Sequence, residues 1–222
     1  MEGSRDLNKV SATRTVASTL GVLVGLTGFE HGLFAALQGN TVPSSRVIEA
    51  IGPAQRFWEH GTEPAFTLVP NFLVTGILAM IVGLSVMIWS VAYIDRKHGA
   101  WGLALLSVAL FLVGGGFAPL FLAILPVAAA AKINSPLTWW RTYLPPRLRG
   151  MLAGVWQWPL AAFVFLSLLL VVLAIFGYPF MWFCDADQTL NLMTPIGNIT
   201  FYILGPIVLV TAFAYDILKQ AD

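Results

Sequence analysis

Long apolar runs with few charged residues constrain the fold of this chain more than any other feature. About 20 consecutive apolar residues in a helix cross a bilayer core of about 30 Å, because a helix satisfies its backbone polar groups internally. The 222 residues are 58% hydrophobic and only 10% charged. The sequence therefore predicts an all-α polytopic transmembrane helix bundle. It is expected to form a single domain over residues 1–222, with membrane segments at about 15–37, 72–94, 101–131, 153–177 and 196–218.

The segment 101–131 differs from the other four because its length fits neither one span nor two. It carries no charge, and Gly114-Gly115-Gly116-Phe117-Ala118-Pro119 lies in its middle. One helix of this length would be about 46 Å long, whereas two complete spans need about 40 residues. We predict a helical hairpin that turns at the glycines, so that four full spans plus this hairpin make five to six membrane segments. The sequence leaves open whether its arms cross fully as two short spans or re-enter.

The distribution of Lys and Arg predicts the orientation of the chain. With a hairpin at 101–131, ten of the 12 basic residues fall on the side of the two termini and two on the other side. A single crossing would divide them five and seven, which shows no useful bias. Since basic residues favour the cytoplasmic side, we expect both termini in the cytoplasm.

The polar segments between the spans are too short to form a soluble domain with its own core. Within residues 39–70, Arg46 to Ile51 resembles a turn or two of surface helix that ends at Gly52-Pro53. Tyr178 to Pro195 is expected to be a loop before a last span that is kinked at Gly205-Pro206. Asp216, one turn from the end of that span, is expected at the membrane interface.

An adjacent carboxylate and imidazole, Glu30 and His31, interrupt the first apolar run and are the leading candidate catalytic residues. An acidic residue at mid-membrane costs roughly 2.5–3.5 kcal/mol and usually faces protein or a wet cavity. Thr27 and Gln38 share a broad helix face with the pair and are further candidates for a polar site. A hydrogen-bonded Glu30 without any chemistry is the structural alternative.

A second aromatic-Glu-His-Gly tetrad, Trp58 to Gly61, places Glu59 and His60 shortly before Glu63. His31, His60 and Glu63 are suitable ligand types for zinc or iron(II), although they would have to converge from separate elements. Glu59 is a further polar candidate. The single cysteine, Cys184, excludes an intramolecular disulfide and a cysteine-cluster metal site. The sequence does not identify a cofactor.

Two other features indicate partners. Small residues on the first span, Gly21, Gly25, Gly28 and Gly32, form a stripe that suits close approach of another helix or a second copy of the chain. The loop 132–150 combines aromatic and basic residues that suit a headgroup layer containing anionic lipid, namely Trp139, Trp140, Arg141, Arg147 and Arg149. A net charge of +1 indicates no nucleic-acid partner.

Several motifs resemble those of a group of uncharacterised prokaryotic multi-pass membrane proteins. They are Gly-Phe-Glu-His-Gly at 28–32 and Gly-Gly-Gly-Phe-Ala-Pro at 114–119, together with the segments 37–40, 51–58 and 132–134. The resemblance covers roughly residues 20–180. It implies a bacterial or archaeal cell membrane and carries over no activity.

Three functions remain open at this level. A small transporter of a solute, ion or proton would use Glu30 as the cation or proton acceptor and His31 as its proton partner. A membrane-embedded enzyme would act on a lipid or isoprenoid, with or without a metal. A structural subunit would only pack against partners through its glycine faces.

Overall fold

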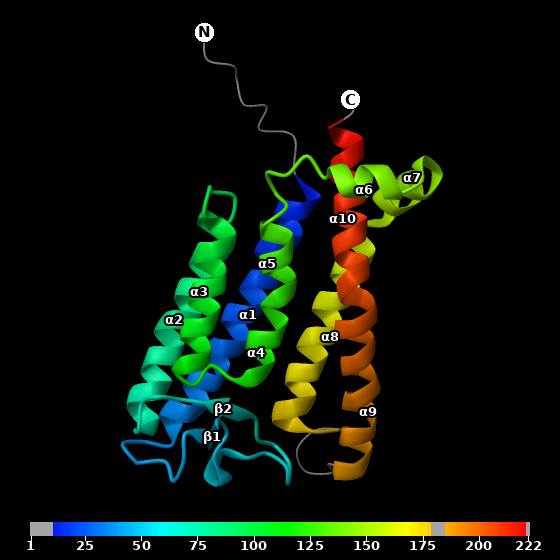
Figure 1. The fold of residues 1–222 in the computed structure, drawn as a ribbon. Helices are drawn as coiled ribbons and strands as arrows, with labels where there is room; N and C mark the ends of the chain where they lie inside the picture. The colour runs from blue at the N-terminus through cyan, green and yellow to red at the C-terminus, as the bar shows by residue number, and fades with distance from the viewer. Residues whose placement is uncertain (1–10, 179–184, 221–222) are drawn as a thin grey trace.

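Four long apolar helices form the body of the protein, as the sequence predicts. The computed structural model describes residues 11–178 and 185–220. The helices long and apolar enough to cross a membrane are α1 (Ala12–Leu37), α2 (Phe72–Ala92), α8 (Gln157–Phe176) and the continuous helix over Ala186–Lys219. They lie roughly side by side, and the chain leaves the bundle at the same end for both termini (Figure 1). The protein is an integral membrane protein with an all-α bundle fold.

The predicted hairpin is confirmed and occupies the space beside α1 and α2. Its arms are α3 (Gly99–Leu112) and the consecutive helices α4 (Phe117–Leu122) and α5 (Ile124–Ala130). Gly114 and Gly116 adopt φ values of +96° and +87°, which side chains other than glycine rarely tolerate. An arm of 14 residues is about 21 Å long, shorter than the hydrocarbon core, and both arms end near the termini (Figure 1).

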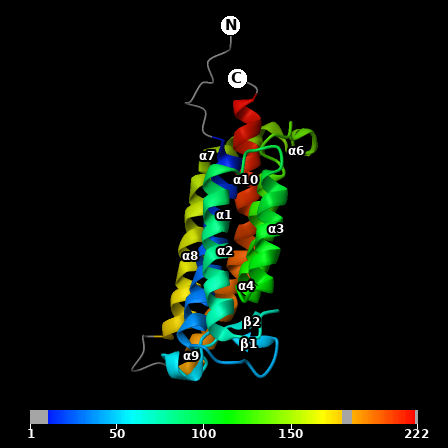
Figure 2. The same cartoon turned by 90° about the vertical axis from the view of Figure 1, so that its left-hand side faces the viewer.

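The loop after α1 closes the opposite end of the bundle and covers the hairpin turn (Figure 2). The expected surface helix at residues 46–51 is wrong: β1 (Val47–Glu49) pairs antiparallel with β2 (Pro64–Phe66), and the short helix η1 (Pro53–Gln55) lies between them. Val47 and Ile48 are β-branched and suit a strand once a partner strand is available. Leu68 N–H donates to the Leu112 carbonyl and the Thr75 hydroxyl donates to the Val113 carbonyl, so protein groups satisfy two backbone acceptors where the turn begins.

The last transmembrane helix begins about ten residues earlier than expected. It comprises α9 (Ala186–Asn198), η3 (Ile199–Leu204) and α10 (Gly205–Lys219). The Asp185 carboxylate caps its first turn by accepting from the Gln188 N–H, and residues 186–195 of the expected loop are helical. The six residues of η3 form a π-helical turn directly before Gly205-Pro206, and the missing N–H of Pro206 weakens regular α-helical bonding there.

Glycines bring α1 and α2 into close contact. Gly25 and Gly32 of α1 lie against the backbone of α2 at Gly83 and Gly76, while Gly28 faces Leu110 of α3. The predicted small-residue stripe is therefore occupied within the chain, and an additional role in contacting a second chain stays a prediction. The remaining helices, α6 (Thr138–Tyr143) and α7 (Pro146–Val155), lie at the end of the termini and carry the predicted anionic-lipid residues (Figure 1).

Candidate functional site

Two carboxylates and an imidazole meet at the inner side of the 38–71 loop. Glu30 and His31 lie in the second half of α1, and Glu63 comes from the loop just before β2. His31 Nε2 is 2.6 Å from Glu63 Oε2, and His31 Nδ1 is 3.2 Å from Glu30 Oε2. Each of the three residues offers a ligand atom within 4.8 Å of the others. We refer to these three side chains as the Glu–His–Glu cluster.

The imidazole of His31 is held in one orientation from two sides. Its Nδ1 is 2.8 Å from the Thr27 carbonyl oxygen, a separation at which Nδ1–H donates. The ring is only 2% exposed, and a Cβ at Gly116 would lie 2.3 Å from Nε2. The glycine turn of the hairpin therefore packs on the ring and leaves Nε2 directed at Glu63. That approach is a close ion-pair contact without the geometry of a regular hydrogen bond.

The fold of the loop determines where Glu63 lies. The β1–β2 register pairs Glu49 with Pro64, and the Ala50 N–H donates to the Glu63 carbonyl at 2.8 Å. The side chain of Gln38 donates to the Glu49 and Ala50 carbonyls, which ties this strand to the end of α1. Burial alone would raise the pKa of the Glu63 carboxyl, but the attraction of the positively charged His31 ring outweighs burial, so this pKa lies below its ordinary value.

A cavity of about 240 Å³ adjoins the cluster and is otherwise mostly apolar. Glu30, His31 and Glu63 line it together with residues of α4, α8 and α9. Glu30 Oε1 has no hydrogen-bond partner among the described residues. The hydroxyl of Ser167, a residue that is 7% exposed and lines the same cavity, also lacks a partner there. The cavity therefore presents unused polar atoms on two helices.

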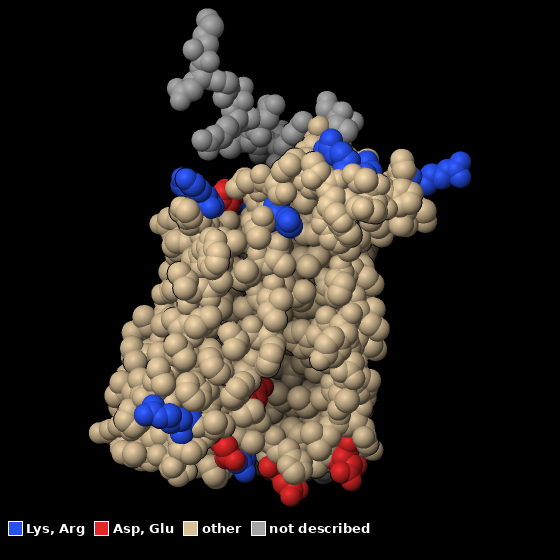
Figure 3. Space-filling view, in the orientation of Figure 1, with Lys and Arg blue, Asp and Glu red and all other residues tan. Residues whose placement is uncertain are grey.

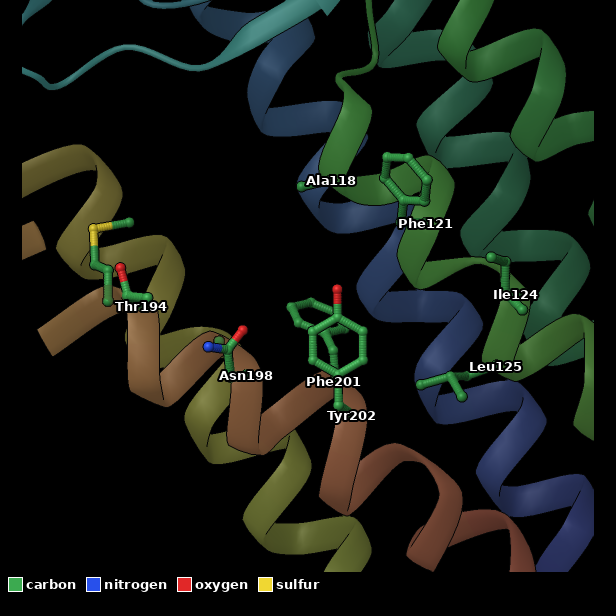
Figure 4. Close-up of a pocket in the computed structure, with 10 residues that line it drawn as sticks. Ala118, Phe121, Ile124, Leu125, Thr194, Asn198, Phe201 and Tyr202 are labelled. Atoms are coloured by element: carbon green, nitrogen blue, oxygen red, sulfur yellow. The ribbon is translucent and has the colours of Figure 1, made fainter.

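A larger cleft of about 520 Å³ leads from this cavity to the side of the bundle (Figure 4). Ala118, Phe121, Ile124 and Leu125 lie on one wall, and Thr194, Asn198, Phe201 and Tyr202 lie on the other. The cleft and the cavity share four lining residues, namely Ala118, Met193, Gly197 and Phe201. Figure 3 shows the hollow on this face of the molecule, with acidic atoms visible inside it.

The structure brings together only some of the residues that the sequence singles out. Glu30, His31 and Glu63 meet, and Thr27 orients the His31 ring and lines the cavity. Glu59 and His60 are exposed, and the His60 ring packs edge-on to Trp58 with the ring centroids 5.8 Å apart. Among the described residues, the third possible metal ligand beside His31 and Glu63 is Glu30, and not His60 as the sequence suggests.

Three contributors to the site are not evident from the sequence. Ser167 is the one hydroxyl residue in α8, and Gly116 belongs to the triple glycine that marked the hairpin turn. Their spacing in the sequence gives no indication that either lies near His31. Gly197, at the junction of cleft and cavity, carries no signal that sets it apart from other helix glycines.

Comparison of the chain with family models, with curated proteins and with solved structures finds no match.

Proposed function

We propose that this protein is a membrane-embedded enzyme that acts on an amphiphilic substrate, a lipid or an isoprenoid. The observation that carries the proposal is the continuity of an apolar lateral cleft with a buried Glu–His–Glu cluster. Phe121, Ile124 and Tyr202 are exposed at the cleft, on the flank that faces the acyl chains if the bundle spans a bilayer. A substrate tail in the cleft would place its polar group in the cavity, next to Glu30 and His31.

The cluster suits acid–base chemistry on that polar group. An imidazole exchanges protons near neutral pH, and a carboxylate beside it accepts a proton or orients the ring. Glu30 Oε1 is the unused acceptor in the cavity, so we assign Glu30 as the general base. His31, held by Thr27 and Glu63, is assigned as its proton partner.

Transport is the other function that the Glu30–His31 pair suggests, and the packing of α1 makes it the weaker proposal. Translocation requires a polar route from the cluster to the end of the bundle where α1 begins. The N-terminal half of α1 would line this route, and its inward-facing residues are apolar and buried, namely Ala12, Val16, Ala17, Leu20, Leu23 and Val24. A cleft that opens sideways needs no such route. Uptake of protons or cations into liposomes by the wild-type protein would favour transport over the enzyme.

Filling the junction of the cleft and the cavity is expected to abolish substrate entry. A Cβ at Gly197 meets no atom within 4 Å, so Gly197→Phe directs a ring into empty space without a backbone clash. In liposomes that contain a phospholipid with a photoreactive acyl chain, we expect wild-type adducts on residues 118–125 and 193–202. Gly197→Phe should reduce these adducts at least about fivefold and leave the adducts on the outer face of α2 unchanged.

Two further variants separate binding from chemistry. Gly154→Phe is the matched control, because Gly154 also lies in a helix with nothing within 4 Å of its Cβ, and it should label as the wild type does. Glu30→Gln should keep the adducts and lose the conversion of lipids, followed by mass spectrometry of the liposome lipids. Equal labelling of wild type and Gly197→Phe would refute the cleft as the substrate site.

We also propose that both termini lie in the cytoplasm of a prokaryotic cell. The hairpin returns to the end where α1 begins, so eight of the ten Lys and Arg among the described residues belong to that end. Most acidic residues on the view in Figure 3 lie at the opposite end. Cys184 lies outside the described residues, but its neighbour Asp185 begins α9 at that opposite end (Figure 1).

An impermeant maleimide is therefore expected to label Cys184 in intact cells, while an N-terminal tag stays protected from external protease. A Cys184→Ser variant controls for background labelling. Finding Cys184 and the tag on the same side of the membrane would contradict this orientation.

A further inference from the structure

We propose that Glu30, His31 and Glu63 bind one divalent transition-metal ion, which deepens the proposed function because the ion would face the substrate cavity. In this state His31 is a metal ligand instead of the proton partner of Glu30. The ligand atoms of the three residues lie within 4.8 Å of one another. Ligand atoms of one zinc ion lie about 2.0–2.2 Å from it and thus at most about 4.4 Å apart. In a tetrahedral site the ligand atoms lie roughly 3.3–3.6 Å apart. To close on an ion, the 2.6 Å contact between His31 and Glu63 must widen, and the Glu30 carboxylate must turn from Nδ1 toward Nε2 of the ring.

The hydrogen bonding of His31 prepares the ring for metal binding. A metal-ligating histidine almost always donates its second ring N–H to a carboxylate or a backbone carbonyl. His31 Nδ1 has such an acceptor in the Thr27 carbonyl at 2.8 Å. The lone pair of the neutral ring is then on Nε2, which lies 2.6 Å from a Glu63 carboxylate oxygen. Two electron-rich atoms this close share a proton, and a metal ion that replaces this proton would move them to roughly 3.3–3.6 Å apart.

A divalent ion would neutralise the cluster. Two carboxylates and one imidazolium leave one negative charge in a largely apolar surrounding, which is costly until a second proton or a divalent ion compensates it. Among the described residues no Lys or Arg forms a salt bridge with Glu30 or Glu63, since Arg56 pairs with Glu49 and Arg14 with Asp95. A divalent ion with neutral His31 and two carboxylates makes the cluster neutral.

The cavity supplies an observation that is independent of the cluster. Ser167, on α8, is 7% exposed, and its hydroxyl has no partner among the described residues although it lines the cavity beside the three ligands. A buried hydroxyl normally has a partner, so this one is available to a molecule that enters the cavity. The space of about 240 Å³ lets a substrate oxygen or water reach the open side of an ion held by three protein ligands.

The donor set selects the class of metal. A nitrogen ligand with two carboxylates suits zinc, iron(II) or manganese(II), whereas calcium and magnesium favour sites made of oxygen alone. The set also differs from the combination of His31, His60 and Glu63 that the sequence suggests. The His60 ring packs against Trp58 on the exposed side of the loop, so we expect it to contribute nothing to affinity.

Cobalt(II) is a suitable probe because its visible absorption reports on ligand number and type. Full-length protein in detergent, stripped with a chelator, should bind close to one Co²⁺ per chain, and Zn²⁺ should displace it. Glu63→Gln and Glu30→Gln should each weaken binding at least roughly 10–100-fold, the loss that even outer-shell changes cause. Glu63→His, which restores a metal ligand, should retain the absorption band.

Two matched variants keep this test decisive. Glu59→Gln and His60→Gln change the same residue types in the same loop, and both should bind Co²⁺ as the wild type does. Size-exclusion profiles and unfolding temperatures show whether each variant is folded. Wild-type protein without Co²⁺ binding, or equal binding by Glu63→Gln and Glu59→Gln, would overturn the metal site. Photolabelling of the cleft in the presence of chelator tests substrate binding separately, so failure of one proposal is distinguishable from failure of the other.

Discussion

Replacing Asp216 by alanine is expected to destabilise the folded protein by about 3 kcal/mol, although the residue is far from the candidate site. Hydrogen bonds to a charged group contribute about 1.5–3 kcal/mol each, and unsatisfied buried donors add a penalty. One Asp216 oxygen accepts from the Ala12 N–H at 2.9 Å. The other accepts from the Thr13 N–H at 2.9 Å and from the Ser11 hydroxyl at 2.8 Å.

The position of this carboxylate explains why the expected effect is large. Asp216 is only 8% exposed, and its side chain caps the start of α1. Its expected position at the membrane interface stays a prediction. The first N–H groups of a helix have no partner within the helix, and the positive end of the helix dipole favours an anion there. Without Asp216 the N–H groups of Ala12 and Thr13, both almost fully buried, would remain unsatisfied.

Thermal and denaturant unfolding in detergent would measure the effect. Asp95→Ala is the control at the same end of the bundle, because the Asp95 side chain is 43% exposed and forms a surface ion pair with Arg14. Such a pair is worth about 0–1 kcal/mol. Asp216→Asn keeps an acceptor but loses the charge, so its loss of unfolding free energy should lie between those of Asp216→Ala and Asp95→Ala. Equal stability of Asp216→Ala and Asp95→Ala would mean that the cap does not hold α1.

Replacing Gly32 by leucine is expected to abolish the folded bundle. A Cβ there would lie 2.7 Å from the Gly76 carbonyl oxygen and 2.8 Å from the Met80 nitrogen. Both atoms belong to the backbone of α2 and cannot rotate away as a side chain does. Overpacking of a core costs about 1–3 kcal/mol and sometimes more. Here α1 and α2 themselves must separate, so we expect Gly32→Leu to lower the free energy of unfolding by more than this range.

Fluorescence-detected size exclusion of a tagged protein would show the loss as aggregation or absence of the folded peak. Gly154→Leu is the control, since a Cβ at Gly154 meets no atom within 4 Å. Gly76→Leu should reproduce the defect from the other helix, because its Cβ would lie 2.4 Å from the Ala36 nitrogen. A normal folded peak for Gly32→Leu would show that α1 and α2 do not approach as closely as the structure has them.

The membrane segments were predictable because a bilayer imposes one dominant rule. Backbone polar groups in lipid must be satisfied within a helix, so apolar length alone indicates the spans. The hairpin followed from the same rule, since the uncharged length of residues 101–131 fits neither one span nor two, and Gly114 and Gly116 supply the turn. Glu30 and His31 stood out for the related reason that ionisable groups are costly at that depth.

Contacts between residues distant in the chain were decided only by the tertiary structure. Glu63 reaches His31 because β1 pairs with β2 in one register, and a shift of one residue would turn its side chain to the other face. His60, three residues earlier, lies in a turn before the strand, and its ring packs against Trp58 instead. Asp216 meets the N-terminus of α1 only once the bundle has closed. Amino-acid patterns report local periodicity and hydrophobicity, whereas these contacts depend on how separate elements pack.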